Sequence, residues 1–300
     1  MRGLPFGSRR GADAMERVEA GRSLWSDAWR RLKANRAAVV GAATLATLAL
    51  AAVVGPHLTP FAYDEVRKPE VWLPPLTNGH ILGTDALGRD LLARLLTGLR
   101  VSLAIGLVAT AVSLVIGVAW GATAGFVGGR TDELMMRIVD VLYSLPFIFF
   151  VILLMVTFGS NLVLMFVAIG AVEWLTMSRI VRGQTLTLKQ KEFVEAARAA
   201  GLTGGQIVAR HIVPNLLGPV AVYVTLTIPA VILAESFLSF LGLGVQPPMA
   251  SLGGLIADGA QQMELAPWLL IFPGVAMVAT LMSFNFIGDG LRDALDPKDR

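Results

Sequence analysis

The sequence predicts an all-α integral membrane protein with about six transmembrane helices. Hydrophobic residues make up 55% of the 300 residues and charged residues only 16%, whereas about a quarter of a soluble chain is charged. The deficit lies in long stretches without Asp, Glu, Lys or Arg, at 37–63, 101–129, 141–172, 212–234 and 265–288. Each is long enough to cross a bilayer as a helix. No strand-like alternation accompanies them, which argues against an outer-membrane barrel.

Cysteine and histidine usage limits the kinds of site that the chain can carry. There is no cysteine, which excludes a disulfide framework and thiolate metal sites. The three histidines, His57, His80 and His211, lie far apart and form no ligand-spacing motif. The formal net charge is only +3, which does not indicate a nucleic-acid partner. We therefore expect no resident metal and no nucleic acid.

The N-terminal part is predicted to pass from a disordered polar tail, 1–22, into a helix that lies in the membrane interface. Tryptophan, leucine and alanine recur at helical spacing over 23–36, and basic residues crowd the end nearest the first apolar stretch. Tryptophan and basic amphipathic helices favour the interface. We expect an interfacial elbow that leads into a first span at 37–55, with an ordinary cytosolic helix as the alternative.

The second span is predicted at 101–125, after a polar, proline-rich connection at 56–100 that we place outside the cytoplasm. The span carries Gly117, Gly121 and Gly125 at four-residue spacing. Small residues at this interval let two membrane helices approach closely. We expect this glycine face to pack against another span.

Charge bias decides how the uncharged stretch 141–172 is divided. Its length exceeds one span, and a Gly-Ser-Asn triplet at 159–161 is typical of a turn. We therefore predict two spans, at 138–158 and 162–178. This division places the basic loop 179–211 on the same side as the basic N-terminus, in agreement with the positive-inside rule.

The last two spans are predicted at 216–239 and 268–288. The connection 241–267 contains no Lys or Arg, as expected of a loop outside the cytoplasm. Both termini are therefore predicted to be cytoplasmic. Three spans contain a proline that removes a helical hydrogen bond and favours a kink; these prolines are Pro146, Pro229 and Pro273.

The loop between the fourth and fifth spans is predicted to form a helix–turn–helix. The stretch 189–200 is rich in good helix formers, and Gly201 follows where a left-handed residue ends a helix. Thr203 and Gln206 have the spacing of a capping box that begins a second helix. Pro214 marks where this helix bends or restarts as the next span. The alanines of the first helix form a small-residue surface that another protein can approach closely.

This loop resembles the EAA loop of ABC importer permeases. The general pattern is Glu-Ala-Ala, three residues, Gly, nine residues and Ile-x-Leu-Pro. In this sequence Glu195-Ala196-Ala197, Gly201 and Val213-Pro214 match it, and His211 stands in the isoleucine place. That variant resembles the peptide-importer branch.

Other segments resemble the C-type permease subunit of dipeptide and oligopeptide importers. They lie at 80–103, 176–201, 235–248 and 288–297. Leu252 departs from that branch, in which a tryptophan is expected at this place.

The resemblance implies the type I ABC importer permease fold and divides the chain into four parts. The tail at 1–22 precedes a part at 23–100 with the elbow, the first span and the extracytoplasmic segment. A five-helix core follows at 101–288, and the cytoplasmic EAA loop lies within it. This loop covers 180–215, and a cytoplasmic tail covers 289–300.

The resemblance also implies a non-catalytic translocation subunit driven by separate ATPases. The chain contains no Gly-Lys dipeptide, so it lacks the G-x-x-x-x-G-K phosphate loop. ATP and Mg²⁺ are expected on partner subunits, with no cofactor in this chain. The expected partners are two ATP-binding subunits, a second homologous permease subunit in a heterodimer, an extracytoplasmic solute-binding protein and membrane lipid, in the cytoplasmic membrane of a prokaryote. The residues expected to contact the ATPase are Glu192, Glu195, Ala196, Ala197 and Gly201.

Two carboxylates are candidates for the substrate pathway. Glu173 and Glu235 lie at or inside predicted spans, where a carboxylate is costly and often functional. Each is a candidate to face a water-filled pathway and meet a peptide amino terminus; the alternative is a helix-packing contact or an interfacial position near a span end. Asp85, Arg89 and Asp90 are expected to hold structure.

The cargo stays open, because the same branch also imports nickel chelates, glutathione and other small solutes. An intramembrane enzyme or an ATP-independent secondary transporter is the alternative from another class. An intramembrane protease needs a nucleophile or paired aspartates within its spans, and no such residues are placed so here. A secondary transporter would work without ATP, which a transport assay can distinguish.

Overall fold

The computed structural model describes residues 24–159 and 162–295 of the chain, and this part is built from helices and connecting segments without a named β-strand. The α-helices are α1 (Leu24–Ala34), α2 (Arg36–Leu58), α3 (Leu91–Val127), α4 (Gly129–Ser144), α5 (Phe147–Phe158), α6 (Leu162–Leu188), α7 (Glu192–Ala199), α8 (Gly204–Ile207), α9 (Val213–Phe240), α10 (Leu252–Gln261) and α11 (Trp268–Leu295). The predicted tail at 1–22 lies outside the described residues, as do the last five residues of the tail predicted at 289–300.

Five helical segments are long and apolar enough to cross a membrane, and a bent pair supplies a sixth. The five are α2, α3, α6, the run from α8 through α9, and α11, and the bent pair is α4 with α5. The prediction of about six transmembrane helices is therefore confirmed. The helices α9 and α11 continue through Pro229 and Pro273.

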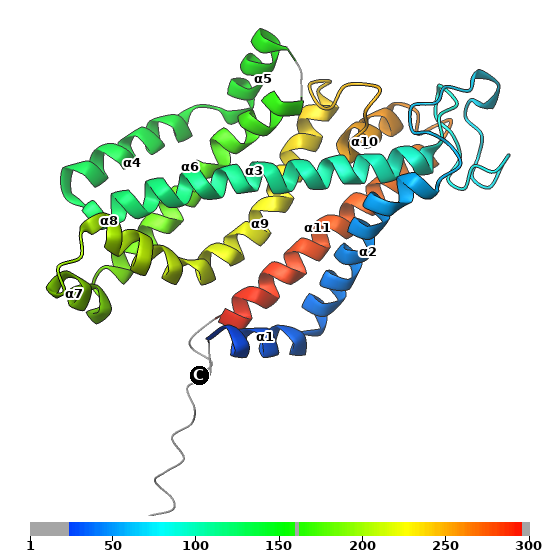
Figure 1. Cartoon of the computed structure of the whole chain (residues 1–300). Coiled ribbons are helices and arrows are strands. Elements are labelled where there is room, and N and C mark those ends of the chain that lie inside the picture. The colour runs from blue at the N-terminus through cyan, green and yellow to red at the C-terminus, as the bar shows by residue number, and fades with distance from the viewer. Residues whose placement is uncertain (1–23, 160–161, 296–300) are drawn as a thin grey trace, which may run out of the picture.

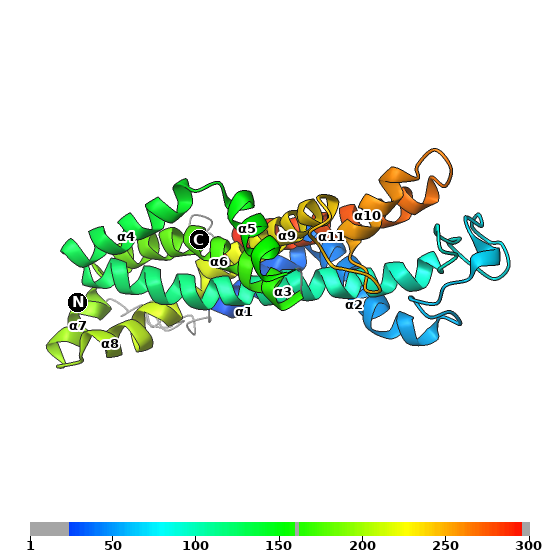
Figure 2. The same cartoon turned by 90° about the horizontal axis from the view of Figure 1, so that it is seen from above.

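The helices form an elongated bundle along α3 (Figure 1). The α7–α8 pair lies at one end of α3 and the connection between α2 and α3 lies at the other, in both views (Figures 1 and 2). The helices α2 and α11 pack side by side, and α1 packs against α11. A helix at 23–36 was predicted, and α1 confirms it.

The glycine face of α3 packs against another span, as predicted, and that span is α6. A side chain at Gly117 would stand 2.6 Å from the Cβ of Met177, and one at Gly125 would stand 2.9 Å from the backbone oxygen of Arg182. Gly121, between them, has equally little room, because the backbone of Ser178 lies against it. The missing side chains therefore let the two backbones approach closely.

The helix α3 begins ten residues earlier than the predicted span, because Asp90 caps it. The carboxylate of Asp90 accepts a hydrogen bond from the backbone N–H of Ala93 at 2.7 Å. The polar residues that suggested a loop are part of the helix, and Arg94 is buried in an ion pair with Asp85. Burial of a charge inside this helix requires such a partner.

The segment before α3 is held by side chains that were expected to be structural. The carboxylate of Asp85 accepts hydrogen bonds from the backbone N–H of Arg89 at 3.0 Å and from its Nε at 2.8 Å. The buried ring of His80 lies 2.7 Å from Asp90 and 3.3 Å from Glu70 through its two nitrogens. These contacts join the segment to the first turn of α3.

The third predicted span is broken into α4 and α5 at Pro146. The two helices meet at a bend of 79°. Leu145 has an extended backbone (φ −75°, ψ 135°), because a following proline disfavours the helical conformation. The break leaves α5 as a short apolar helix that cannot span a membrane by itself.

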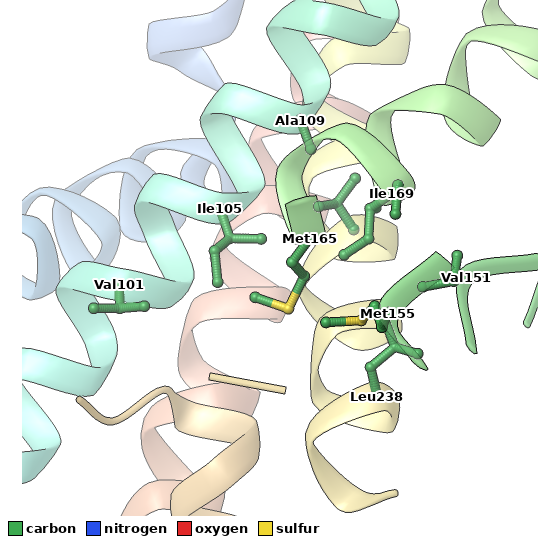
Figure 3. Packing of buried hydrophobic residues seen from close by; sticks show 10 residues of the cluster. Val101, Ile105, Ala109, Val151, Met155, Met165, Ile169 and Leu238 are labelled. Atoms are coloured by element: carbon green, nitrogen blue, oxygen red, sulfur yellow. The ribbon is translucent and has the colours of Figure 1, made fainter. Parts of the chain in front are cut away.

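The short helix α5 is anchored by a buried apolar cluster (Figure 3). Met155 of α5 packs beside Met165 of α6 and Leu238 of α9, and Ile105 of α3 completes the contact. Flexible methionine side chains fill irregular gaps of this kind well. The cluster fixes α5 against three of the membrane-spanning helices.

Candidate docking site and intramembrane carboxylates

The helix α7 ends as the sequence predicts. Gly201 has a positive φ of 82°. The N–H of Leu202 donates to the carbonyl of Ala197 at 3.1 Å, and the N–H of Gly201 donates to the carbonyl of Arg198 at 3.0 Å. This pair of hydrogen bonds is the Schellman motif, which favours glycine at the left-handed position.

The helix α8 begins with the predicted capping box. The N–H of Thr203 donates to Oε1 of Gln206 at 2.9 Å, and the N–H of Gln206 donates to the hydroxyl of Thr203 at 3.4 Å. The helix–turn–helix is therefore confirmed, with α7 shorter than the predicted 189–200.

The two sides of α7 differ in burial. Val194 and Ala197 are buried in a cluster with Val181 of α6, Ala122 of α3 and Ile207 of α8. The opposite side is exposed and carries acidic and small side chains. We call this exposed side the docking face; it consists of Glu192, Glu195, Ala196 and Ala199.

The predicted contact residues thus fall into two groups. Glu192, Glu195 and Ala196 lie on the docking face, and Gly201 lies in the exposed turn that follows it. Ala197 points into the molecule, so its side chain supports the docking face from below.

The α7–α8 pair sits on the end of α3. The ammonium of Lys189 donates to the carbonyl of Gly125 at 2.9 Å, at the last turn of α3. The guanidinium of Arg198 lies 5.5 Å from the ring centre of Phe126. Together with the buried cluster, these contacts hold α7 in one packed block with α3 and α6.

The second helix of the pair continues into the membrane through a π-helical turn, Val208–Ile212. This turn ends two residues before Pro214, which lacks an N–H and whose ring crowds the carbonyl of the preceding turn. The wider turn accommodates the ring without ending the helix. The sequence predicted a bend or a restart at Pro214, and the structure shows a continuous helical segment with a local bulge.

Two ion pairs join α4 to the same block. Arg182 of α6 contacts Asp132, and Arg179 of α6 donates to Asp140 at 2.9 Å. Sequence reasoning missed both pairs. The paired residues are 50 and 39 positions apart, and no local pattern in the sequence connects them.

Glu235 is sealed inside a serine cluster. Its side chain is fully buried, and its carboxylate accepts a hydrogen bond from Ser239 at 2.6 Å and from Ser102 at 3.4 Å. The hydroxyl of Ser102 also accepts the N–H of Leu252 at 3.0 Å, and Ser251 caps α10. The cluster joins α3, α9 and α10, so Glu235 makes a helix-packing contact in this structure.

Leu252 occupies the first turn of α10, a helix that hydropathy did not predict. Its side chain is fully buried in an apolar cluster with residues of α3, α9 and α11. The leucine that stands where a tryptophan was expected is therefore a buried packing residue.

Glu173 has a different environment, at an open pocket of about 460 Å³. The pocket lies where α4, α5 and α6 meet, and apolar side chains line most of it. No hydrogen bond or ion pair joins the Glu173 carboxylate to another described residue. The structure therefore separates the two predicted carboxylates, because Glu173 faces a pocket and Glu235 does not. Among the described residues, no group of three or more His, Cys, Asp or Glu is placed to hold a metal ion.

Comparison with known families shows to which family the chain belongs. Residues 113–300 match the family described as the inner membrane component of binding-protein-dependent transport systems. The chain belongs to this family. Residues 23–75, which include α1 and α2, match the N-terminal transmembrane domain of oligopeptide transport permease C.

Relatives within this family of transport components align with nearly the whole chain. The oligopeptide transport system permease protein OppC of Haemophilus influenzae is 55% identical over 96% of this chain and 94% of its own length. OppC of Escherichia coli K12 is 54% identical, covering 95% of each chain. The dipeptide transport system permease protein DppC of Bacillus subtilis is 45% identical over 97% of this chain and 90% of its own length.

A solved structure agrees on the fold of this transport component. A chain of the inward-facing methionine ABC transporter MetNI superposes with a TM-score of 0.55, covering 67% of this chain and 96% of that chain. The sequence identity is 20%, so this likeness concerns the fold alone. It agrees with the type I permease fold that the sequence predicts.

Proposed function

We propose that this chain is a permease subunit of an ATP-driven importer that carries oligopeptides across the cytoplasmic membrane of a prokaryote. The observation that carries the proposal is the end-to-end identity of 54–55% with permeases named for oligopeptide transport.

The docking face gives the proposal its mechanism. In this view an ATPase subunit seats α7 in a cleft and moves it as the two ATPases close and part. The rigid contacts among α7, α3 and α6 carry that motion into the membrane. The spans then expose the pathway to one side at a time, which is a two-state change biased by the ligand.

We assign the other functions of the transporter to partner subunits. Two ATP-binding subunits hold ATP and Mg²⁺, a second permease subunit completes the pathway, and a solute-binding protein delivers the peptide from outside. The chain itself carries out no chemical step and needs no cofactor. Its termini and the α7–α8 pair lie in the cytoplasm in this arrangement, and the connection 59–90 lies outside.

Reconstitution tests the proposal. The complex is co-purified from its native host through a tag on this chain, placed in proteoliposomes and supplied with its binding protein. We expect ATP-dependent uptake of labelled three- to five-residue peptides, and no uptake with a non-hydrolysable ATP analogue. Gradient-driven uptake by this chain alone, or ATP-dependent uptake of nickel chelates or glutathione in preference to peptides, would contradict the proposal.

A further inference from the structure

The pocket beside Glu173 combines one carboxylate with an apolar wall. Its walls come from Leu142 on α4, Leu145 at the break after α4, Phe150 on α5, and Val172 on α6. A volume of about 460 Å³ lies within the usual range for sites that hold small organic ligands. The pocket opens at the break between α4 and α5, where the helices bend by 79°.

Glu173 is the charged member of this pocket, and nothing in the described chain neutralises it. The side chain is half-buried near the middle of α6. The two arginines that follow on the same helix are already paired, Arg179 with Asp140 and Arg182 with Asp132. The carboxylate is therefore available to a cation from outside the chain.

The Glu173 carboxylate would be costly if it faced lipid hydrocarbon. A carboxylate at this depth is costly against hydrocarbon and is found facing water, a partner or a ligand. The broken span beside it has the same implication, because non-helical backbone at membrane depth is tolerated where it is buried in protein or lines a cavity. The pocket thus has the character of a site on a hydrated pathway.

We propose that this pocket holds the amino-terminal end of the transported peptide, with its ammonium group on Glu173 and its first apolar side chain on the wall of α4 and α5. The inference rests on the proposed function and names the part of the cargo that this subunit contacts. An ammonium group has three donors and no acceptor, which suits a single acceptor carboxylate. A divalent metal requires several oxygen or nitrogen ligands, and the pocket offers one carboxylate.

Photocrosslinking in the complete complex tests the pocket without the binding protein. The complex is placed in lipid nanodiscs with a tripeptide whose central residue is benzoylphenylalanine, with either a free or an acetylated amino terminus. We expect the free peptide to label residues that line the pocket, at 142–145, 150 or 171–176, when mapped by mass spectrometry. Acetylation should reduce this labelling about tenfold, because a hydrogen bond to a charged group is lost.

Variants at Glu173 provide the decisive comparison. Glu173→Gln should lower labelling by the free peptide about tenfold and leave labelling by the acetylated peptide unchanged, whereas Glu173→Asp should keep most of it. Glu133→Gln serves as the matched control, because Glu133 is an exposed carboxylate on α4 outside the pocket. It should label as the unmodified complex does.

Three results would overturn the inference. They are equal labelling by the two peptides, labelling confined to other segments, or loss of the second permease subunit from the Glu173→Gln complex. The last result would identify Glu173 as a subunit contact instead. If the unmodified complex takes up no peptide in proteoliposomes, the proposed function itself fails, which is a separate and distinguishable outcome.

Discussion

Arg182 holds Asp132 through two parallel hydrogen bonds, from Nε to Oδ1 at 2.5 Å and from Nη2 to Oδ2 at 2.6 Å. Bidentate pairs of this kind are the strongest between charged side chains and fix the relative geometry of their two helices. The pair joins α4 to α6, close to the element that carries the docking face. It is therefore placed to make α4 follow any motion of α7 and α6.

Breaking the ion pair between Arg182 and Asp132 should uncouple the motion of α4 from that of the ATPase subunits. We expect Asp132→Ala to lower the free energy of unfolding by about 1–3 kcal/mol, because Arg182 loses its partner. ATP hydrolysis per peptide imported should rise. The measurement is the ratio of the two rates in proteoliposomes, with thermal unfolding in detergent as the check on stability.

Partner exchange separates coupling from simple stability. The double variant with Asp132→Arg and Arg182→Asp should recover part of the ratio, whereas each single reversal should not. Arg137→Ala is the matched control, since Arg137 is an exposed cation on α4. An unchanged ratio in Asp132→Ala would show that this pair does not transmit the motion.

Replacement of either of two neighbouring alanines on α7 by leucine should have different effects, because one side chain is exposed and the other is buried. Ala196→Leu places bulk on the docking face, so we expect the ATPase to be lost while the fold is kept. Ala197→Leu places the same bulk in a packed cluster, so we expect a loss of about 1–3 kcal/mol in stability from overpacking. Co-purification of the ATPase and thermal unfolding distinguish the two effects.

Docking of α7 in a close-fitting cleft requires a small side chain at position 196. If Ala196→Leu retains the ATPase at the level of the unmodified complex, α7 does not seat in a close-fitting cleft. Ser or Gly at the same position should bind the ATPase normally, because both stay small.

Gly201→Val should weaken coupling through the backbone. The position has a φ of 82°, and a β-branched residue resists the left-handed conformation by about 1–2 kcal/mol. The space around its Cβ position is open, so the effect is conformational and not a clash. We expect reduced ATPase association in co-purification and slower peptide uptake.

Gly205 offers the matched control for that change. The space around its Cβ position is also open, but its φ is not positive. Gly205→Val should therefore leave ATPase association near normal. Normal transport and normal ATPase association in Gly201→Val would contradict the role given to this turn.

Glu235 should behave as a structural residue. Glu235→Ala removes the acceptor of Ser239 and opens a cavity, so we expect a loss of about 2–4 kcal/mol in stability. Glu235→Gln keeps an acceptor oxygen and nearly the same volume, and should retain most peptide uptake. If Glu235→Gln keeps its stability but abolishes uptake, the carboxylate acts in the pathway and the packing role is insufficient.

Local features of this fold were predictable from the sequence because they depend on nearby residues. The Schellman turn at Gly201 and the capping box of Thr203 with Gln206 each involve groups a few positions apart. The glycine spacing on α3 predicted that another span would approach it closely, and the structure shows this approach. The partner helix was not predictable, since glycine spacing does not name the surface that fills the gap.

Features that depend on contacts between residues far apart in the sequence were missed or predicted at the wrong positions. The early start of α3 depends on the cap at Asp90 and on Asp85, which neutralises Arg94 from outside the helix. The hydropathy pattern therefore predicted a charged loop over the residues that form the first turns of α3. The break at Pro146 was predicted as a kink, but its size depends on how α5 packs on three other helices.

By itself the sequence determined the helical membrane class, about six spans and the α7–α8 pair, because these follow from the length of apolar stretches and from contacts within a few residues. The family was indicated by the resemblance of one motif, from Glu195 to Pro214, to the EAA loop. Only the tertiary structure decided which side of α7 is exposed, that Ala197 faces inward, and that Glu235 is sealed while Glu173 opens to a pocket. The two carboxylates are equivalent in the sequence, each standing beside a long apolar stretch. Their environments differ because the serines around Glu235 and the helices around Glu173 come from distant parts of the chain.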